Sequence, residues 1–309
     1  MNCMDKIFRA MGERNRLRMV LLLEKGPLNV SELVSVLGIS QSNASHHLKI
    51  LLDSGLLTRI GKGNWAFYQI RRDNPFVDEL VNNAFKYREA LPGFHHDMKR
   101  LARCLLKRRE SSRYFFDSKE EGELSRIGEL LPDTSVCVPF LERHLGRREM
   151  VIDVGAGSGR MIPFLLSVSS RVLAVDSSRR MLDLAMEKTS AMKLLHRVEF
   201  RLGEAEHLPV ENEAGDGLLM HMVLHHCGDP ARAVAEAGRV LAPGGVLIVV
   251  DLVEHGDTRY RDVHGDLWPG FTGRSISSIF RRAGLIPGEI EEYEENRILA
   301  AAGMKGDKR

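Results

Sequence analysis

The chain has 309 residues, with 44 lysines and arginines, 42 aspartates and glutamates, and a net charge of +2. This length allows about two domains, and no apolar run approaches the ~18 residues of a membrane span, which argues against an integral helical membrane protein and makes the cytoplasm the expected location. The cysteines are scattered without a C-x-x-C pair, which argues against a disulfide scaffold or a zinc knuckle: Cys3, Cys104, Cys137 and Cys227.

The charge is distributed unevenly along the chain. Residues 1–113 contain 20 Lys and Arg against 11 Asp and Glu, a net of +9, whereas residues 114–309 contain 24 and 31, a net of −7. A basic front half favours nucleic acid as its partner, and an acidic back half favours a small ligand. The alternative is that these charges only form a solvated surface. A DNA-binding role for the front half therefore also requires a recognisable DNA-binding motif.

The front half predicts helices at residues 5–11, 15–24, 30–37 and 41–54. Asn29 and Glu32 have the spacing of a capping box, and Gly38 ends the third helix. Ser40 caps the fourth helix. Two helices joined by a Gly-Ile-Ser turn predict a helix-turn-helix.

The second helix of this motif has two distinct faces. Its apolar face contains Ala44, Leu48, Leu51 and Leu52 at helical spacing. The opposite face has side chains suited to base edges and phosphates in a major groove: Gln41, Ser42, Ser45, His46 and Lys49.

A β-hairpin is predicted next. Residues 57–60 and 65–70 form its strands, and residues 61–64 its turn. Arg59 and Lys62 place positive charge near the tip, where a wing meets phosphate. A purely solvated surface is the competing interpretation of these polar side chains.

The segment Leu28 to Ile70 resembles the winged-helix domain of the arsenical-resistance repressor (ArsR/SmtB) family, most strongly in QSNASHHLKILLDSGLL and GNWAFYQI. The resemblance implies a DNA-binding domain over residues 1–74 in a dimeric bacterial repressor that reads a palindromic operator on double-stranded DNA. Family metal sensors carry E-L-C-x-C, where this chain has E-L-V-S-V, or histidines on the later helix predicted here at 75–85, which has none. No metal site is therefore expected, and the adjacent histidines of His95-His96-Asp97 are interpreted as a surface pair.

Residues 75–131 are predicted to be a helical dimerisation and connector region. The stretch Lys99 to Arg109 is basic, with leucines on one face. It is either a coupling helix that also touches DNA or, the interpretation we favour, an amphipathic helix packed on the neighbouring domain.

A second domain is predicted over residues 132–303, followed by a polar tail at 304–309. An apolar strand ends in Asp153, glycines follow at 155, 157 and 159, and a helix comes next. Glycine permits positive φ and close ligand approach, and the helix N-terminus offers free N–H groups. An ordinary tight strand–helix connection is the alternative to a nucleotide site.

Further motifs follow in order. A second apolar strand ends in Asp176, which can accept both ribose hydroxyls. Gly203-Glu-Ala-Glu206 resembles the loop that grips adenine in class I methyltransferases, and Asp216 to His226 resembles their fourth strand and the loop beyond it. A helix is expected at 230–241, with Gly244-Gly245 as its stop, and an antiparallel strand pair ends near Ala302.

Together these motifs resemble the class I S-adenosylmethionine (SAM) methyltransferase family over roughly residues 149–303. The resemblance implies an α/β, Rossmann-like fold with a seven-stranded, mostly parallel sheet. It also implies that SAM or S-adenosylhomocysteine (SAH) contacts Asp153, Gly155, Gly157, Gly159, Asp176, Ser177, Met181, Glu204, Ala205 and His221. Met181 as a core residue remains an alternative.

No catalytic residue is assigned. His225 or His226 is either a base or a loop residue that holds backbone, and Cys227 is most simply a structural thiol. The whole architecture resembles ArsR-type regulators with a methyltransferase-like domain, some of which respond to SAH and control methionine-cycle genes. The first hypothesis is a homodimeric repressor with SAH or SAM as effector. The others are an active methyltransferase on a small molecule and, more weakly, a metalloid sensor.

Overall fold

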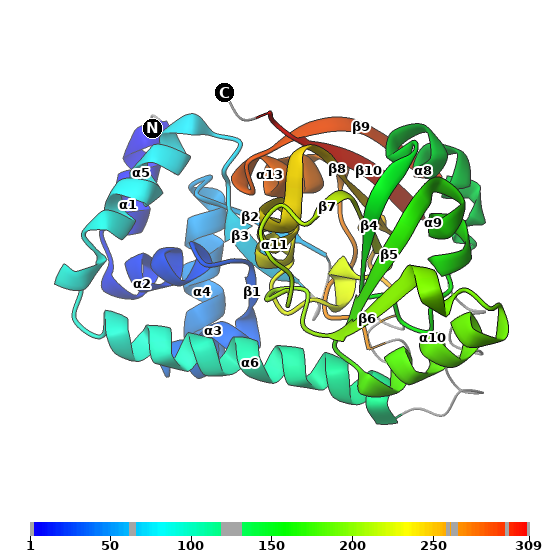
Figure 1. Ribbon diagram of the computed structural model, residues 1–309. Helices are drawn as coiled ribbons and strands as arrows, with labels where there is room; N and C mark the ends of the chain where they lie inside the picture. The colour runs from blue at the N-terminus through cyan, green and yellow to red at the C-terminus, as the bar shows by residue number, and fades with distance from the viewer. Residues whose placement is uncertain are drawn as a thin grey trace. The chain divides into compact units, whose positions relative to one another are not determined.

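A computed structural model describes residues 3–61, 66–118, 132–257, 260, 265–293 and 297–307. The chain divides into two compact units, residues 1–108 and 109–309, with the boundary inside the long helix α6 (Phe94–Ser118) (Figure 1). This differs from the predicted boundaries after residues 74 and 131. The reason is that buried Val77, Val81 and Leu101, which lie in the predicted connector, belong to the apolar core of the first unit.

The first unit is mainly helical. It contains α1 (Cys3–Met11), α2 (Arg14–Leu23), β1 (Leu28–Asn29), α3 (Val30–Leu37), α4 (Gln41–Asp53), β2 (Leu57–Ile60), β3 (Phe67–Ile70), α5 (Pro75–Lys86), the short 3-10 helix η2 (Arg88–Ala90) and the start of α6. Its three strands form an antiparallel sheet in the order β1-β3-β2. The helix-turn-helix therefore forms as predicted, and the two strands of the hairpin pair as predicted over residues 57–60 and 67–70, while residues 62–65, with most of the predicted turn, lie outside the described residues.

Local sequence signals begin and end these helices. Asn29 accepts from the backbone N–H of Glu32 at 2.9 Å, and the Glu32 carboxylate accepts from the N–H of Asn29 at 2.9 Å, so the capping box is present. Gly38, at φ 68°, ends α3 in the left-handed conformation. Ser40 caps α4 through the N–H of Asn43. The short turn between α3 and α4 thus follows from the left-handed Gly38 and the Ser40 side chain.

The second unit is an α/β fold. Its elements after α6 are η3 (Thr134–Cys137), α8 (Val138–Leu145), β4 (Arg148–Val154), α9 (Ile162–Val168), β5 (Ser169–Asp176), α10 (Arg179–Ala191), η4 (Leu195–Arg197), β6 (Val198–Leu202), β7 (Gly215–His221), η5 (Leu224–His226), α11 (Pro230–Val240), β8 (Leu241–Leu252), α13 (Gly273–Arg282), β9 (Leu285–Tyr293) and β10 (Ile298–Lys305).

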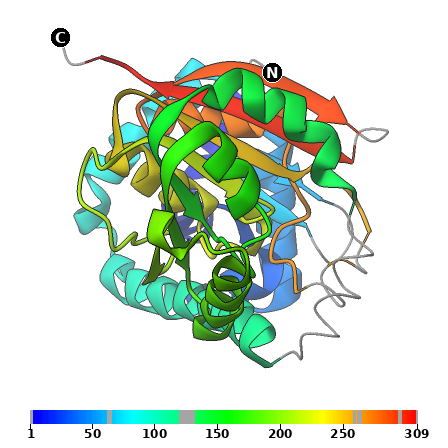
Figure 2. The same ribbon diagram turned by 45° about the vertical axis from the view of Figure 1, so that its right-hand side comes forward.

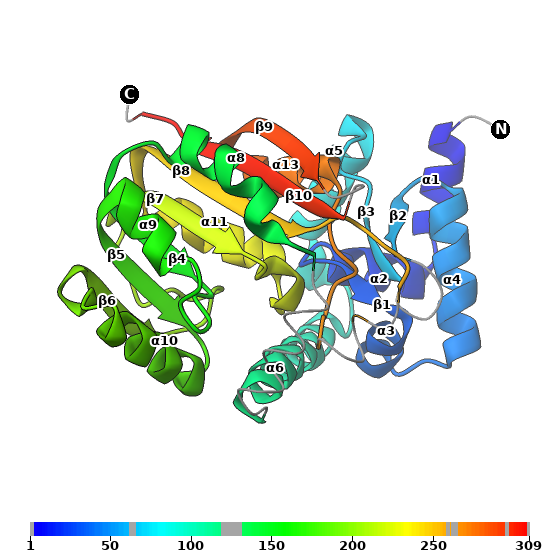
Figure 3. The ribbon, with the colours of Figure 1, turned by 90° about the vertical axis from the view of Figure 1, so that its right-hand side faces the viewer.

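One sheet of seven strands organises this unit, in the order β6-β5-β4-β7-β8-β10-β9 (Figure 3). All neighbouring pairs are parallel except those of β10, which runs antiparallel to both β8 and β9. The order reverses between β4 and β7, and open α/β sheets bind ligands at such a switch point, beyond the carboxyl ends of the strands. The predicted Rossmann-like fold is confirmed.

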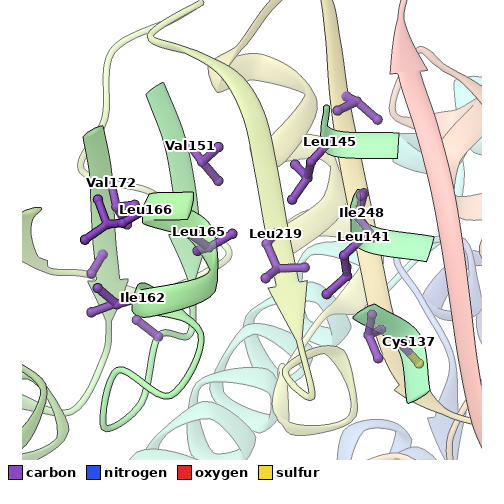
Figure 4. Packing of buried hydrophobic residues seen from close by; sticks show 14 of the residues in the cluster. Cys137, Leu141, Leu145, Val151, Ile162, Leu165, Leu166, Val172, Leu219 and Ile248 are labelled. Carbon is purple, nitrogen blue, oxygen red and sulfur yellow. The ribbon is translucent and has the colours of Figure 1, made fainter. Parts of the chain in front are cut away.

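Helices cover both faces of the sheet. α8, α9 and α10 lie on one face and α11 and α13 on the other (Figure 1), and α8 lies close to the antiparallel pair β9 and β10 (Figure 2). Leu141 of α8 and Leu165 of α9 pack against side chains of the central strands, among them Leu219 and Ile248 (Figure 4). This dry layer holds the strand ends, and the loops that leave them, in fixed positions.

Two local expectations were wrong. Helix α11 ends at Val240, and Leu241 already pairs with Gly215, so Gly244, at φ 73°, lies in an irregularity of β8 instead of stopping the helix. The predicted tail begins too early, because β10 pairs with β8 as far as Met304. Among the described residues, no helix is long and apolar enough to cross a membrane.

Candidate ligand pocket and DNA-reading helix

The glycine loop after β4 depends on glycine at each of its three positions. Gly155, Gly157 and Gly159 all have positive φ, at 71°, 53° and 78°. A Cβ on Gly155 would lie 2.4 Å from the Val223 side chain, and one on Gly159 would lie 3.1 Å from Cβ of Ala185. Nothing lies within 4 Å of a Cβ built on Gly157. The outer glycines therefore allow close packing, and the middle one faces open space.

Asp176 closes this loop from the end of β5. One carboxylate oxygen accepts from the N–H of Gly157 and the other from the N–H of Ser178, both at 2.8 Å. Burial raises the pKa of Asp176, and the backbone donors act against that shift. Each oxygen keeps a lone pair, so the carboxylate can still accept from a ligand's hydroxyl groups.

Two buried polar groups beside the loop lack a hydrogen bond at one atom, Oδ2 of Asp153 and Nε2 of His221. Burial, and then the charge of Asp176, raises the pKa of Asp153 to about 7. Burial, and then the charge of Arg160, lowers the pKa of His221 to about 4, so this imidazole is neutral at physiological pH. Unsatisfied buried polar atoms are uncommon and call for a partner.

The opposite rim contains Glu204 and Glu206. Arg109, near the middle of α6, forms an ion pair with Glu204 at 3.3 Å. Glu206 is 5% exposed and accepts from the N–H of Asp229. Burial raises its pKa, whereas that hydrogen bond lowers it. This rim therefore carries carboxylates held in defined orientations.

These groups surround a cavity of about 260 Å³. Eight of the ten predicted contact residues line it: Gly155, Gly157, Asp176, Ser177, Met181, Glu204, Ala205 and His221. Asp153 and Gly159 do not. Asp153 is only 1% exposed on β4, and Gly159 packs against α10, so both support the loop from beneath.

Several residues that line the cavity were not predicted from the sequence. Arg109, Arg113 and Phe116 come from α6, and Met222, with φ 57°, follows β7. The basic stretch of α6 was interpreted as a connector because no motif marks it as part of a pocket. The only available signal was its amphipathic pattern, which predicted packing on the second domain.

His225 lies in the wall of the cavity and is fully buried. Its Nδ1 lies 2.7 Å from a carboxylate oxygen of Asp251 at the end of β8. Burial alone would lower the pKa of His225, but the charges of Asp251 and Asp266 outweigh it and raise the pKa to about 9. Burial also raises the pKa of the Cys227 thiol well above its usual value, so Cys227 stays protonated and unreactive.

In the first unit, α4 exposes the side chains predicted to contact DNA and buries most of its predicted apolar face. The exposed residues are Gln41, Ser42, Ser45, His46 and Lys49, and Arg59 is exposed on β2. Lys62 lies outside the described residues. Ala44, Leu48 and Leu51 are buried, while Leu52 is half-buried. The face left open is therefore polar.

Helix α3 is tied to α6 within the first unit. Arg108 is 8% exposed and donates its Nε–H to a carboxylate oxygen of Glu32 at 3.0 Å. The other oxygen of Glu32 closes the capping box of α3. The position of α6 in this unit is therefore linked to the first helix of the helix-turn-helix.

Comparison with known proteins agrees with this division. Residues 13–59 match the family of bacterial regulatory proteins of the arsR family, and residues 152–249 match a methyltransferase domain. The arsenical resistance operon repressor of Bacillus subtilis is 37% identical over 79 residues, which cover 25% of this chain and 70% of the repressor.

Methyltransferase GfsG of Streptomyces halstedii is 29% identical over 178 residues, 56% of this chain and 62% of that protein. The chain spans about two fifths of another relative, a 37.1 kDa protein in a transposon of Streptomyces fradiae (40%). Among solved structures, geranyl diphosphate C-methyltransferase of Streptomyces coelicolor, in complex with Mg²⁺, geranyl diphosphate and SAH, has a TM-score of 0.53 at 14% identity, covering 64% of this chain and 97% of that one, and shows the shared fold. The chain thus belongs to the arsR family of bacterial regulatory proteins and carries a methyltransferase domain of the SAM-dependent fold in the same polypeptide.

Proposed function

We propose that this protein is a homodimeric bacterial transcriptional repressor whose methyltransferase-like unit binds SAH or SAM as an effector that sets its affinity for operator DNA. It acts in the cytoplasm, where the DNA is. Control of methionine-cycle genes is the regulatory role that fits an adenosyl effector best.

The pocket suits an adenosyl ligand on three grounds. Asp176 offers a fixed carboxylate to the ribose hydroxyls, as in other nucleotide-binding α/β sheets. Gly157 leaves its backbone open to close approach. Asp153 and His221 keep buried polar atoms without partners, and the amino and carboxylate groups of a methionine moiety are chemically able to satisfy them.

The observation that carries the effector role is the sharing of α6 by both units. Two consecutive arginines of this helix bind to different units: Arg108 to Glu32 of α3 in the first, and Arg109 to Glu204 of the pocket rim in the second. A ligand that takes Glu204 as its acceptor for the adenine amine competes with Arg109. Ligand binding therefore changes a restraint on α6 at Arg109, and the residue before it, Arg108, is bound to Glu32 of the helix-turn-helix.

The free energy that such a switch requires can be stated. Moving a two-state protein from about 99% bound to 99% released needs a ligand that favours one state by about 5.5 kcal/mol. The side chains of Arg109 and Glu204 are 25% and 36% exposed, and an ion pair with this exposure contributes about 0.2–1 kcal/mol. The Arg109–Glu204 pair is thus one part of the switch, and most of the free energy must come from further contacts with the ligand.

Dimerisation has a candidate surface on α1. Met4 and Phe8 are 46% and 52% exposed, although both are large and apolar. The ring of Phe8 also contacts the edge of Phe76 on α5, at 6.0 Å between centroids. Covering these side chains in a second copy removes apolar surface from water. Sedimentation equilibrium of Phe8→Glu against wild type tests this part of the proposal.

The effector hypothesis is tested by measuring DNA binding with and without ligand. An operator is first selected from a random duplex library, and its affinity is followed by fluorescence anisotropy while SAH, SAM or adenosine is titrated. We expect SAH or SAM to change the operator affinity at least tenfold, with adenosine weaker. Calorimetric binding of either ligand with no change in operator affinity would refute the sensor.

Arg109→Gln tests the coupling itself. Because this variant lacks the ion pair from the start, its operator affinity without ligand should already be shifted toward that of the ligand-bound protein, and the further change on adding ligand should be smaller. Arg103→Gln, an exposed arginine on the same helix, is the matched control and leaves the change intact. An undiminished ligand effect in Arg109→Gln would remove the ion pair from the mechanism.

An active methyltransferase is the second candidate, favoured by the His225–Asp251 pair in the cavity wall. With its pKa raised to about 9, the His225 side chain carries its proton at neutral pH and is suited to donate it, or to stabilise negative charge that develops on an acceptor substrate. Incubation with methyl-labelled SAM and cell extract distinguishes the two. Transfer of label without any ligand effect on DNA favours the enzyme, and a DNA effect without transfer favours the sensor.

A further inference from the structure

Three donor side chains that neither the fold nor the proposed effector explains lie together in the second unit. His225 and His226 belong to η5, and Asp266 belongs to the segment before α13. One ligand atom from each lies within 4.8 Å of the other two. Nε2 of His225 is 3.7 Å, and Nε2 of His226 is 3.9 Å, from the same carboxylate oxygen of Asp266.

Backbone and side-chain hydrogen bonds hold the two segments together. The carbonyl of His225 accepts from the N–H groups of Leu267 and Trp268, at 2.9 and 3.0 Å. The indole N–H of Trp268 donates to the carbonyl of Cys227 at 2.6 Å. Asp266 is therefore positioned over the two imidazoles by its neighbours, and the cluster does not depend on any attraction among its own members.

Asp251 orients the first imidazole. Its oxygens accept from the N–H groups of Leu224 and Leu252, at 2.9 and 2.8 Å, and one of them faces Nδ1 of His225 at 2.7 Å. These contacts fix the Asp251 side chain against Nδ1 of His225. Nε2 then points toward Asp266. A carboxylate behind a histidine is the usual support of a metal-binding imidazole.

A shared proton does not account for the cluster. A hydrogen bond requires about 2.7–3.2 Å between nitrogen and oxygen, and both contacts to Asp266 are longer. Asp266 is 1% exposed, and within the part of the chain that the structure describes neither of its carboxylate oxygens has a hydrogen-bond partner, nor does Nε2 of His225. Buried polar atoms without a partner are uncommon and call for one.

A metal ion fits this arrangement better. With bonds of about 2.1 Å, ligand atoms around a tetrahedral zinc ion lie roughly 3.4 Å apart. The distances of 3.7 and 3.9 Å from Asp266 to the two imidazoles would have to shorten by only a few tenths of an ångström to reach this spacing. Two imidazoles and one carboxylate suit zinc and its first-row neighbours, whereas magnesium and calcium prefer oxygen ligands. His225 and His226 also line the cavity, so a fourth position would face it.

The geometry points to a divalent transition-metal site of the zinc type, formed by Nε2 of His225, Nε2 of His226 and a carboxylate oxygen of Asp266, with Asp251 as the orienting group and one coordination position open to the cavity. The open position takes water or an oxygen or nitrogen atom of a small molecule. This site is separate from the helix positions used by metal-sensing repressors, and it does not depend on SAH or SAM acting as effector.

The sequence did not predict this site. The adjacent histidines alone are a poor chelating pair, because neighbouring residues rarely point to one ion, and Asp266 lies far along the chain. The 3-10 turn of η5 brings the two rings to 4.0 Å between centroids, and the tertiary fold supplies the third ligand. From the patterns of the winged helix, the scattered cysteines and the adjacent histidines at 95 and 96, no metal site was expected in the chain, and the site proposed here departs from that expectation.

The test uses full-length protein stripped by a chelator and dialysed, then titrated with Zn²⁺ and with Co²⁺. We expect one ion per chain by calorimetry and elemental analysis, and visible absorption of the Co²⁺ form that indicates four- or five-fold coordination. Asp266→Asn keeps the shape of the side chain and should lower affinity at least tenfold. His196→Gln, an exposed histidine in the same unit, is the matched control and should bind as wild type does.

Far-UV circular dichroism verifies that each variant is folded. If Asp266→Asn does not fold, His226→Gln replaces it in the test, because the His226 side chain is partly exposed and its substitution disturbs the fold less. It should lower affinity in the same way. A folded wild type that takes up no stoichiometric ion would overturn the site. So would equal uptake by wild type and the ligand variants, because the ion would then bind elsewhere on the surface.

Discussion

The exposed face of α4 and the cavity beyond the sheet are built in opposite ways. On α4 the polar side chains face outward, and the helix is anchored by buried Ala44, Leu48 and Leu51. In the cavity the polar groups face inward, and several are buried, with His225 0% and Glu206 5% exposed. The first surface can be changed one residue at a time, whereas each cavity residue also supports its neighbours.

This difference predicts how mutations act. An exposed side chain on α4 contributes to binding and little to stability, because water replaces its partner when it is removed. A cavity residue contributes to both, because its loss leaves buried donors or acceptors unsatisfied. Four substitutions test this contrast, from the largest expected effect to the smallest.

Gly155→Ala should be the most damaging. The new Cβ would meet the Val223 side chain at 2.4 Å, and the residue would remain at φ 71°. Left-handed backbone costs about 1–2 kcal/mol and overpacking another ~1–3 kcal/mol, so we expect about 3 kcal/mol less stability by urea unfolding. Gly284→Ala has a similar φ, 75°, and nothing within 4 Å, so it should lose only the backbone part. An equal loss of stability in the two variants would show that the Val223 side chain moves away from the new methyl group at no cost.

Asp176→Asn should lower SAH affinity about 100-fold, or ~2.7 kcal/mol. The amide cannot accept from Gly157, Ser178 and a ribose together, as the carboxylate can. Isothermal titration calorimetry measures the loss, with Asp183→Asn, exposed on α10, as the control. Wild-type affinity in Asp176→Asn would place the ribose elsewhere.

His221 should make stability depend on pH. Its pKa is about 4 in the folded chain, against a reference value of 6.5, so the unfolded chain binds more protons between these values. Stability from this group is therefore present above pH 6.5 and is lost as pH falls toward 4, by at most about 1.4 kcal/mol per pH unit. His221→Asn removes this group, so the free energy of unfolding is measured for wild type and for this variant at several pH values. Buried carboxyl groups with a raised pKa, such as Asp153, make stability fall as pH rises, but they do so equally in wild type and variant and cancel in the difference. The difference should therefore rise with pH between about 4 and 6.5, and a difference that does not change with pH would contradict the prediction.

Lys49→Ala should have the smallest effect on the fold and a defined effect on DNA. If Lys49 contacts a phosphate, operator affinity falls by about 1 kcal/mol at moderate salt, and the slope of log affinity against log salt decreases by about 0.9. The unfolding midpoint should not move, because the side chain is exposed. Arg103→Ala, exposed on α6, should leave the salt slope unchanged; a reduced slope there would mean that α6 also reaches DNA.

Much of the architecture follows from local sequence alone. The capping box at Asn29 and Glu32, the left-handed stop at Gly38 and the apolar spacing of α4 determine the helix-turn-helix, because each acts within a few residues of itself. The glycine loop and Asp176 are equally local, since each follows the end of a buried strand. These signals predicted both domains and eight residues of the cavity wall.

The tertiary structure alone decided what distant segments bring to the same place. The end of α6 lines the cavity through Arg113 and Phe116, although its sequence indicates only an amphipathic helix. Asp266 joins His225 through hydrogen bonds that no pattern in the chain reveals. Periodicity determines which face of an element is buried, whereas the partner across that face depends on how the whole chain packs, and for this reason the cavity's second wall and the metal ligands could not be predicted from the sequence.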